Sequence, residues 1–362
     1  MIIMRKLASI QLIDEIIPIK GADSVELAKV LGWYTIVKIG QFKKGDLCCF
    51  FEIDSIVPER PEFEFMRPKK FRVKTMKSSR LGVVSQGLAM NLDILGDEYL
   101  YECFGGMQTF KSPEETRASL VGADVTGLLN VQKYEIPIEG GKNTKAKGMF
   151  PTYIVPETDE LRIQAFPNLL QEIWGLPYVA RIKYDGTSFT CYSFNEESGV
   201  CSRHQELYET DGDVYWRIAH IYDLPKRLVE YCKLIGKNYA IQGEICGPIV
   251  IHGGRNPLNA KIDDLHLFSV YDIDAHAYLS DAAAESVAKD LGIKFVTFFE
   301  KGDFFNYTIA ELEEKTRGVF YPGTKNQVEG LVFRPKEYTY SPSIGGMLSF
   351  KVINKDYLLE EK

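Results

Sequence analysis

The run Arg181-Ile182-Lys183-Tyr184-Asp185-Gly186-Thr187-Ser188 places a lysine two residues before an Asp-Gly pair, between two apolar, strand-like segments. Alternation along a strand puts Arg181 and Lys183 on one face and Ile182 on the other. A lysine in this position can attack phosphorus as a covalent nucleophile. An Asp-Gly pair between strands is also an ordinary hairpin turn, and the run alone favours that interpretation. The rest of the chain decides between a turn and a reactive site.

Four strand-like segments further along the chain carry isolated charged residues in apolar surroundings. These charges and one aromatic neighbour are Glu244 in 239–246, Tyr271 and Asp272 in 265–273, Glu329 and Arg334 in 328–334, and Lys351 in 348–353. Taken singly, each fits an edge carboxylate, a packed tyrosine or a lysine that extends to solvent. Buried charges are costly unless they are paired or bound to metal, so convergence on one pocket explains the whole set.

Helical patterns separate these strands, which predicts an α+β domain built on antiparallel sheets. A helix is expected over 281–291, ended by Gly292, and another after the capping box that starts at Thr308. The region 214–235 is also expected to be helical, with a break at Pro225.

The N-terminal part of the chain has a different pattern. From residue 8 onward, five or six short strands separated by turns are typical of a small closed barrel, and an OB-fold is the leading candidate. A polar, glycine-bearing stretch at 139–145 then predicts a linker. We therefore expect an OB-fold domain in residues 1–130, a linker in 131–150 and the α+β domain in 151–362.

Charge is unevenly distributed along the chain. The 362 residues include 43 Lys and Arg against 50 Asp and Glu, a net charge of −7 that is unfavourable for binding nucleic acid. The stretch from Arg67 to Arg80 nevertheless contains only basic charges. It is interpreted as a solvated strand and loop unless the neighbouring domain acts on nucleic acid.

Cysteine usage and hydropathy indicate the compartment. Seven cysteines, an odd number without a Cys-x-x-Cys pair, argue for reduced thiols and against a disulfide framework or a zinc site. No apolar run is long enough to span a bilayer, and the N-terminus lacks the features of a signal peptide. We expect an intracellular protein, cytoplasmic or nucleoid-like, that is not secreted and has no membrane partner.

Taken in order, the segments resemble the covalent nucleotidyltransferase superfamily of ATP-dependent ligases and mRNA capping enzymes. The matching motifs are Lys183-Tyr184-Asp185-Gly186, Ser202-Arg203, Gly243-Glu244, Val270-Tyr271-Asp272-Ile273, Glu329-Gly330-Leu331-Val332 and Phe350-Lys351. The Thr187-Ser188 extension and Phe333-Arg334 are similar to RNA ligases. DNA ligases and capping enzymes usually continue into a C-terminal OB domain, whereas this chain ends at Lys362. Its N-terminal part, with Gly21-Ala22-Asp23 and Gly45-Asp46-Leu47, resembles the OB domain of the fifth RNA ligase family.

The resemblance implies an N-terminal OB-fold β-barrel followed by an antiparallel-sheet nucleotidyltransferase domain, an ATP-grasp-like ligase domain. It implies an ATP-dependent RNA ligase that seals 3′-OH/5′-phosphate nicks in RNA repair, through a covalent lysyl-AMP and an adenylylated 5′-phosphate. The implied partner is nicked or broken RNA in duplex form, and a monomer is expected. A non-catalytic OB-containing RNA-binding protein and a DNA ligase are the alternatives.

The resemblance also assigns roles to individual residues. Lys183 is the expected AMP-carrying nucleophile, and Lys351, Glu329 and Asp185 are further catalytic residues. The remaining nucleotide contacts are expected from Ile182, from Glu244 on the ribose hydroxyls, from Tyr271 on adenine, from Arg203 and Lys351 on phosphates, and from Arg162 on the substrate. Asp185, Glu329 and Asp272 are expected to hold Mg²⁺ or Mn²⁺, partly through water.

Two positions depart from the family pattern. Many relatives have Lys-x-Lys in the last motif, whereas Lys351 is followed by Val352-Ile353, so Lys355 is the candidate for the second lysine. His204 stands where many relatives have asparagine. A free lysine is protonated at pH 7, and we expect Lys351, a bound divalent metal or desolvation to lower the pKa of Lys183.

Overall fold

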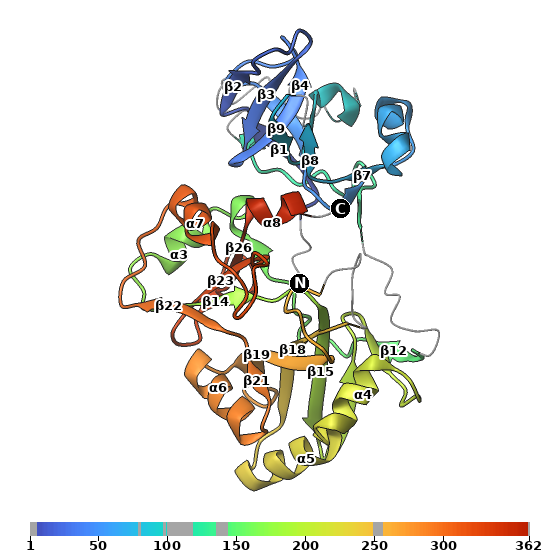
Figure 1. The fold of residues 1–362 in the computed structure, drawn as a ribbon, viewed down its shortest axis with the longest axis vertical. Helices are drawn as coiled ribbons and strands as arrows, with labels where there is room; N and C mark the ends of the chain where they lie inside the picture. The colour runs from blue at the N-terminus through green and yellow to red at the C-terminus, as the bar shows by residue number, and fades with distance from the viewer. Residues whose placement is uncertain are drawn as a thin grey trace. The chain divides into compact units, whose positions relative to one another are not determined.

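The computed structural model describes residues 6–78, 81–96, 99, 119–134, 144–248 and 256–360. The chain divides into two compact units, one within residues 4–136 and the other within residues 137–362 (Figure 1). This boundary falls inside the predicted linker, of which residues 135–143 lie outside the described residues. Regular structure reaches into both ends of that linker: β11 (Gln132–Lys133) pairs within the first unit, and β12 (Ala146–Met149) pairs within the second.

In its described residues, the first unit consists of short antiparallel strands and two 3-10 helices. Their bounds are β1 (Ala8–Leu12), β2 (Glu15–Pro18), β3 (Val25–Val30), β4 (Trp33–Lys38), β5 (Leu47–Phe51), β6 (Ser55–Ile56), η1 (Pro61–Lys69), β7 (Arg72–Val73), β8 (Met76–Ser78), β9 (Val83–Ser85), β10 (Leu88–Met90) and η2 (Leu92–Leu95). β5 lies between β1 and β10 and is buried along its whole length. Phe51 at its end packs edge-on against Phe63, with 5.4 Å between ring centroids. These short strands around a buried aromatic core agree with the predicted barrel.

The basic stretch of this unit is partly neutralised by acidic residues from outside it. Arg67 pairs with Glu64 at 2.5 Å, and the Arg72 guanidinium lies 2.9 Å from Asp54. Arg72 also stacks over the Tyr134 ring at 3.7 Å. The acidic partners lie before the stretch in the sequence, so a count of charges within the stretch overestimates its free positive charge. Its last residue, Arg80, lies outside the described residues.

The second unit contains two main sheets. The eight-stranded sheet has the order β12-β17-β16-β15-β18-β19-β20, with β21 also paired to β19, and the five-stranded sheet has the order β13-β26-β23-β14-β22. The strand bounds are β13 (Leu161–Arg162), β14 (Tyr178–Lys183), β15 (Thr187–Phe194), β16 (Glu197–Cys201), β17 (Gln205–Leu207), β18 (Tyr239–Cys246), β19 (Asp264–Asp272), β20 (Ala277–Tyr278), β21 (Lys294–Phe295), β22 (Phe298–Gly302), β23 (Gly330–Pro335) and β26 (Phe350–Ile353), with a separate hairpin of β24 (Tyr340–Ser341) and β25 (Gly346–Met347). All pairings are antiparallel except β13 with β26 and β19 with β21. The predicted α+β architecture of mainly antiparallel sheets is confirmed.

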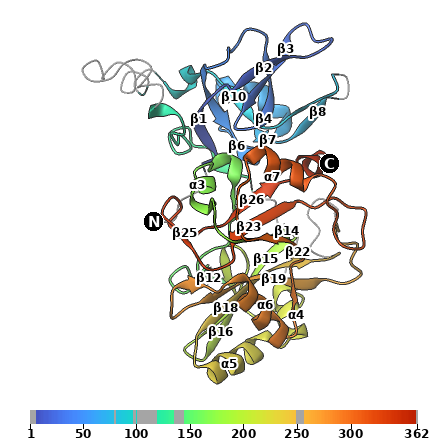
Figure 2. The same cartoon turned by 90° about the vertical axis from the view of Figure 1, so that its left-hand side faces the viewer.

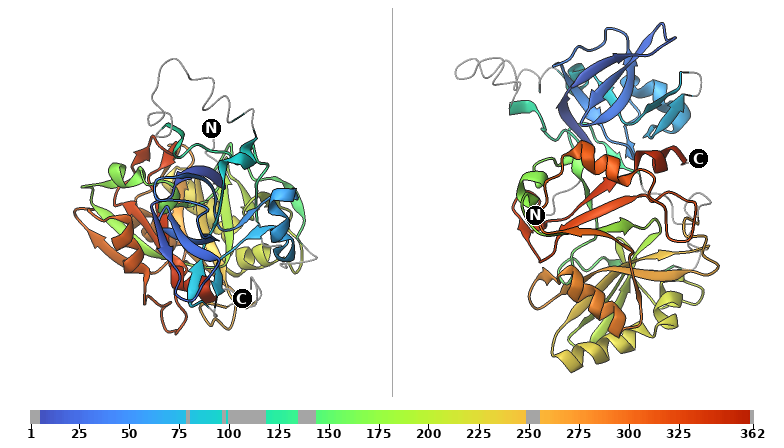
Figure 3. Two further views of the ribbon diagram at one scale, coloured as in Figure 1. Left: turned by 90° about the horizontal axis from the view of Figure 1, so that it is seen from above. Right: turned by 60° about the vertical axis from the view of Figure 1, so that its left-hand side comes forward.

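Helices cover one face of the eight-stranded sheet. Apolar residues of α4 (Val214–Ile221), α5 (Leu224–Ile235) and α6 (Asp281–Asp290) share one core with that sheet (Figure 1; right-hand view of Figure 3, with α5 in yellow and α6 in orange). α6 ends before Gly292 as predicted. The predicted break at Pro225 is displaced: the helix ends at Ile221, and Pro225 stands in the first turn of α5, where its missing N–H needs no partner.

The two faces of the five-stranded sheet differ in character. Its outer face is apolar and packs with α3 (Leu169–Ile173) and α7 (Ile309–Thr316), which starts with the predicted Thr308–Glu311 capping box. Figure 2 shows β14, β23 and β26 side by side. In their register Arg181 lies opposite Val332, which lies opposite Lys351, so these residues share the other face. The charged residues in apolar strands are therefore on one side of this sheet.

Candidate active site

Lys183 is the last residue of β14, and Glu329 directly precedes β23, the neighbouring strand. Lys183 Nζ lies 2.7 Å from Glu329 Oε2. On its other side, β23 approaches β26 closely because position 330 is a glycine, where a Cβ would stand 2.2 Å from the Val352 carbonyl oxygen. The predicted nucleophile and the predicted catalytic carboxylate are thus a hydrogen-bonded ion pair.

Tyr321, which the sequence did not indicate, joins the backbones of this pair. Its buried hydroxyl donates to the Lys183 carbonyl at 3.0 Å and accepts the Glu329 N–H at 3.2 Å. The ring also packs edge-on against Tyr184, with 5.5 Å between centroids. One side chain thereby fixes the distance between two residues that are far apart in the sequence.

The charge around Lys183 is dominated by carboxylates. Burial favours the neutral amine, but the charges of Glu329, Glu244 and Asp185 outweigh burial and raise the pKa of Lys183 above its ordinary value. Burial and Lys351 therefore do not lower this pKa as expected, because the carboxylates outweigh them; a lowering by a bound divalent metal stays a prediction. Without a ligand, Lys183 is therefore an ammonium.

Glu244 lies on β18, on the face of the eight-stranded sheet away from its helices. Burial raises the pKa of Glu244 to about 7; Lys183 opposes that shift, and Glu329 and Asp185 add to it. Gly186 makes the close packing possible, since a Cβ at this position would meet the Ile245 carbonyl oxygen at 2.2 Å and Glu244 Cγ at 3.0 Å. The glycine of the Asp-Gly pair is thus needed for strand contact beside the site.

Asp185 accepts a hydrogen bond from the Tyr357 hydroxyl, which belongs to the C-terminal helix α8 (Lys355–Glu360). Within the described ranges, no group of three or more His, Cys, Asp or Glu side chains is arranged to hold a bare metal ion. Asp185, Glu244 and Glu329 nevertheless place three carboxylates around one lysine, an oxygen-rich and negatively charged set that fits a hydrated divalent cation.

Three cationic side chains, those of Arg162, Arg203 and Lys351, form a second group. Arg162 on β13 stands next to Lys351 on β26 in the parallel pairing of these strands, and both side chains are buried. Asp159 Oδ1 lies 3.0 Å from the Arg203 guanidinium and 3.8 Å from Lys351 Nζ. Burial, reinforced by Lys183 and Arg162 and opposed by Asp159, lowers the pKa of Lys351 to about 7. The structure therefore places Arg162 beside Lys351, and Asp159 links Lys351 to Arg203.

Other predicted residues lie further away. His266 lies opposite Glu244, and Tyr271 follows it by five positions along β19, which is a distance of about 15 Å at the usual strand rise. The Tyr271 ring packs edge-on against Tyr278. Asp272 at the end of β19 pairs with Lys237 at 2.9 Å and accepts the Ala275 N–H at 2.9 Å. This corrects the expectation that Asp272 lies at the metal, because both of its oxygens serve the end of a hairpin.

Ile182 and Lys355 have other surroundings than their predicted roles suggest. The Ile182 side chain is buried in the apolar core, so any contact with a nucleotide goes through its backbone. Lys355 Nζ lies 2.8 Å from Glu313 on α7, and both side chains are largely buried. Lys355, the candidate for the second lysine of the last motif, is thus engaged in an ion pair with Glu313.

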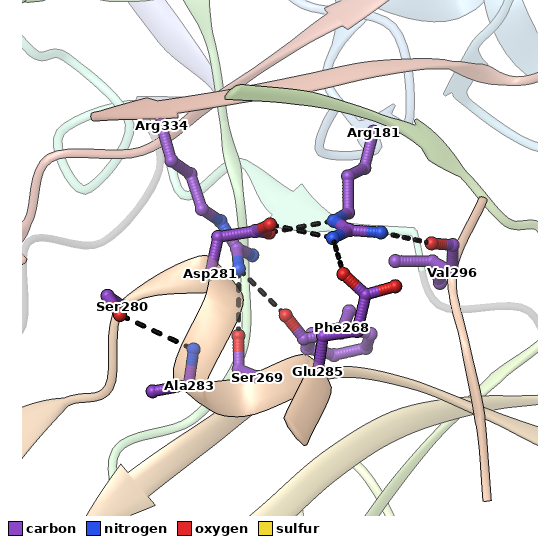
Figure 4. Close-up of polar contacts among 9 residues, drawn as sticks. All are labelled: Arg181, Phe268, Ser269, Ser280, Asp281, Ala283, Glu285, Val296 and Arg334. Carbon is purple, nitrogen blue, oxygen red and sulfur yellow. Dashed lines mark hydrogen bonds and ion pairs between the residues drawn. The ribbon is translucent and has the colours of Figure 1, made fainter. Parts of the chain in front are cut away.

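Two arginines connect the sheets next to the site (Figure 4). Arg181, two residues before the nucleophile, makes a bidentate pair with Asp281 of α6 at 2.6 and 2.7 Å and also binds Glu285 at 2.6 Å. Arg334 donates to the Phe268 carbonyl at 2.8 Å and to Ser269 at 3.0 Å, both on β19. These contacts explain two charged residues of the sequence pattern as links that hold the two sheets together.

Comparisons with known proteins agree with this geometry. A family model described as an OB-fold domain matches residues 7–92, and one described as RNA ligase matches residues 176–353. No curated protein sequence matches the chain.

Solved structures of an RNA ligase from Naegleria gruberi are similar to nearly the whole chain. A lysine-to-alanine variant with ATP and Mn is 30% identical, with a TM-score of 0.78 over 98% of this chain and 99% of that one. The same ligase with pyrophosphate is 30% identical, with a TM-score of 0.78 over 99% of both chains. These matches include the N-terminal OB-fold domain and the domain that carries Lys183. The chain belongs to the RNA ligase family.

Proposed function

We propose that this ATP-dependent RNA ligase seals 3′-OH/5′-phosphate nicks in RNA with Lys183 as its AMP-carrying nucleophile. The observation that carries the proposal is the arrangement of Lys183 against three carboxylates, with Arg203 and Lys351 beside them. An amine nucleophile, an oxygen-rich cation site and a pair of phosphate-binding cations are the groups that nucleotidyl transfer requires.

The Naegleria ligase supports the use of ATP and a divalent metal. Its structures include complexes with ATP and Mn, with AMP and Mn, and with pyrophosphate. Its variants include exchanges of a lysine and an aspartate two positions apart, the spacing of Lys183 and Asp185. They also include exchanges of two glutamates whose separation equals that between Glu244 and Glu329.

The first step joins AMP to the enzyme. Lys183 Nζ forms a bond to the α-phosphorus of ATP while the bond from that phosphorus to the bridging oxygen breaks, and pyrophosphate leaves. Arg203 and Lys351 neutralise charge on the phosphates, which lowers the barrier to in-line transfer. The product is a phosphoramidate on Lys183.

Lys183 must lose its proton before it attacks. Glu329 accepts a hydrogen bond from the ammonium at 2.7 Å and holds it in place. A divalent cation bound by Asp185 and Glu329 supplies positive charge, which offsets the carboxylates and lowers the pKa of the lysine. Glu244, with a pKa near neutrality, then holds the ribose hydroxyls, by hydrogen bonds that either protonation state can make.

The later steps act on RNA. The 5′-phosphate of the nick attacks the lysine-bound phosphorus, so AMP passes to the RNA and Lys183 is released. The 3′-OH then attacks the 5′-phosphorus and AMP leaves. We assign Arg162 to substrate contact and Tyr271 to adenine, and we assign the enzyme to duplex RNA repair as an intracellular monomer. No helix in the described part of the chain is long and apolar enough to cross a membrane.

The test is covalent labelling. The protein is incubated with α-³²P-ATP and Mn²⁺ or Mg²⁺, then denatured and examined for an acid-labile label. We expect label on the wild type and none on Lys183→Ala. Absence of label on the wild type would contradict the proposal and favour a non-catalytic RNA-binding protein, whereas label on the variant would show that another residue carries AMP. Equal sealing of nicks whose 3′-OH strand ends in DNA or RNA would indicate a DNA ligase instead.

A further inference from the structure

Residues 156–160 form a strap that is held by both sheets of the second unit. On the side of the eight-stranded sheet, the Pro156 carbonyl accepts from Gln242 at 2.9 Å, Glu157 lies 3.1 Å from His204, and Thr158 lies 3.1 Å from Ser188. On the other side, Glu160 accepts hydrogen bonds from Arg334 and Ser349, each at 2.6 Å. The strap therefore has a defined position between the two sheets.

Asp159 is the residue of the strap that meets the cationic group. One of its oxygens, Oδ1, lies 3.0 Å from Arg203 and 3.8 Å from Lys351. Arg203 follows a strand of the eight-stranded sheet, and Lys351 belongs to the five-stranded sheet. Two cations from different sheets thus converge on one anionic oxygen. A phosphate oxygen has the same charge and hydrogen-bonding capacity as this carboxylate oxygen.

We propose that the Asp159 carboxylate occupies the phosphate position between Arg203 and Lys351 while no nucleotide is bound and is displaced from it by the phosphates of ATP. This inference rests on the proposed function, which assigns both cations to phosphates. The carboxylate keeps the buried Lys351 paired while no nucleotide is present, and an unpaired buried charge would be destabilising. It also competes with any phosphate for the same two cations.

The competition has a consequence for the reaction. Asp159 weakens the binding of ligands through their phosphates and does not affect binding through adenine or ribose. When pyrophosphate leaves after the first step, the carboxylate returns to the cations and opposes rebinding. Because it opposes the binding of ATP in the same way, the side chain leaves the equilibrium of lysine adenylylation unchanged.

The experiment measures ligand affinity in a Lys183→Ala background, where no covalent adduct forms. Dissociation constants of ATP, pyrophosphate and adenosine are determined by titration calorimetry with Mg²⁺ at low salt and pH 6, where Lys351 is protonated. We expect Asp159→Asn to tighten ATP and pyrophosphate binding by about fivefold, as the loss of one competing ion pair allows, and to leave adenosine unchanged.

Glu157→Gln is the matched control, because it removes a carboxylate of the same strap that binds His204 and neither cation. It should leave all three affinities unchanged. Asp159→Ala provides a second variant and should change affinities in the same direction as Asp159→Asn, with thermal unfolding as the check on folding. Unchanged or weaker pyrophosphate binding in folded Asp159 variants would overturn the inference. It would leave the proposed function intact, since that depends on labelling of the wild type.

Discussion

Lys183 and Lys351 lie on strands of one sheet, yet their surroundings shift their pKa values in opposite directions. Carboxylates around Lys183 outweigh burial and raise its pKa, whereas burial and neighbouring cations lower the pKa of Lys351 to about 7. Lys183, the proposed nucleophile, is thus an ammonium in an acidic region (Asp185, Glu244 and Glu329), and Lys351, the proposed phosphate-binding lysine, lies in a basic region (Arg162, Arg203 and Lys351). The comparison teaches that each region has an excess of one charge. A bound cation would neutralise the excess in the acidic region, and a bound phosphate would neutralise it in the basic region.

The largest expected effect comes from exchanging the nucleophile while keeping its charge. Lys183→Arg retains a cation for Glu329, but a guanidinium does not lose its proton at neutral pH and cannot attack. We expect self-adenylylation, measured by labelling with α-³²P-ATP, to fall by more than about 1000-fold. ATP binding measured by calorimetry should persist. A variant that still takes up label at a substantial rate would show that the acidic region serves a purpose other than holding a nucleophile.

Glu329→Gln removes charge from the acidic region. We expect the rate of lysine adenylylation to fall by about 100-fold, because a cation ligand and the partner of Lys183 are lost. Glu329 raises the pKa of Lys183, so its removal lowers that pKa, and the acidic limb of the pH–rate profile should move to lower pH.

Glu313→Gln is the control for Glu329→Gln. It breaks the ion pair between Glu313 and Lys355, which is similarly buried and lies elsewhere in the unit. It should leave the pH–rate profile of lysine adenylylation where it is. A profile that moves to higher pH in Glu329→Gln would contradict the electrostatic account of the acidic region.

The basic region is tested by the pH dependence of ATP binding. Lys351 has a lowered pKa of about 7, so it is charged below that pH and loses its proton above it. The protonated form binds phosphate, and the KM for ATP should therefore rise between pH 7 and 9, by at most about tenfold per pH unit. Lys351→Arg stays charged throughout and should lack this rise. Parallel profiles for the two proteins would exclude titration of Lys351 as the cause.

The smallest effect is expected from Tyr321→Phe. The variant removes the hydroxyl that joins the Lys183 carbonyl to the Glu329 N–H. We expect a loss of about 1–3 kcal/mol in the free energy of unfolding, because buried backbone groups lose a partner. The adenylylation rate should fall by less than about tenfold. Tyr184→Phe, which loses a bond to the Thr297 side chain, is the control and should change the rate less. Equal effects of both variants would argue against a positioning role for Tyr321.

The parts of the site that the sequence predicted are those that strand register determines. Lys183, Glu244 and Glu329 stand out as isolated charges in apolar surroundings. The pairing of β14 with β23 brings Lys183 beside Glu329, and the pairing of β15 with β18 places Glu244 opposite Ser188, five residues after Lys183. Register does not show which end of a strand reaches the site. Asp272 fits the motif, but it lies at the far end of β19 and binds Lys237.

Residues whose contacts depend on tertiary packing gave no signal. Tyr321 and Tyr357 are single tyrosines in segments without charge patterns, and they reach the nucleophile motif from more than a hundred residues away. Asp159 lies three residues before Arg162, outside every motif of the sequence pattern. The raised pKa of Lys183 without a metal could not be predicted either, because the balance between carboxylates, burial and cations depends on distances that a sequence does not contain.

The parallel pairing of β13 with β26 has a consequence for biosynthesis. Arg162 emerges from the ribosome long before its partner Lys351, and the central strand β23 also appears late in translation. Contacts between such distant segments slow folding, because a long loop must close before they form. β14, the strand that ends in Lys183, therefore cannot pair with β23 until most of the chain has been synthesised. A product of interrupted synthesis that stops before Phe350 contains the complete Lys183 motif but lacks Lys351, so the pairing of Arg162 with Lys351 cannot form in it.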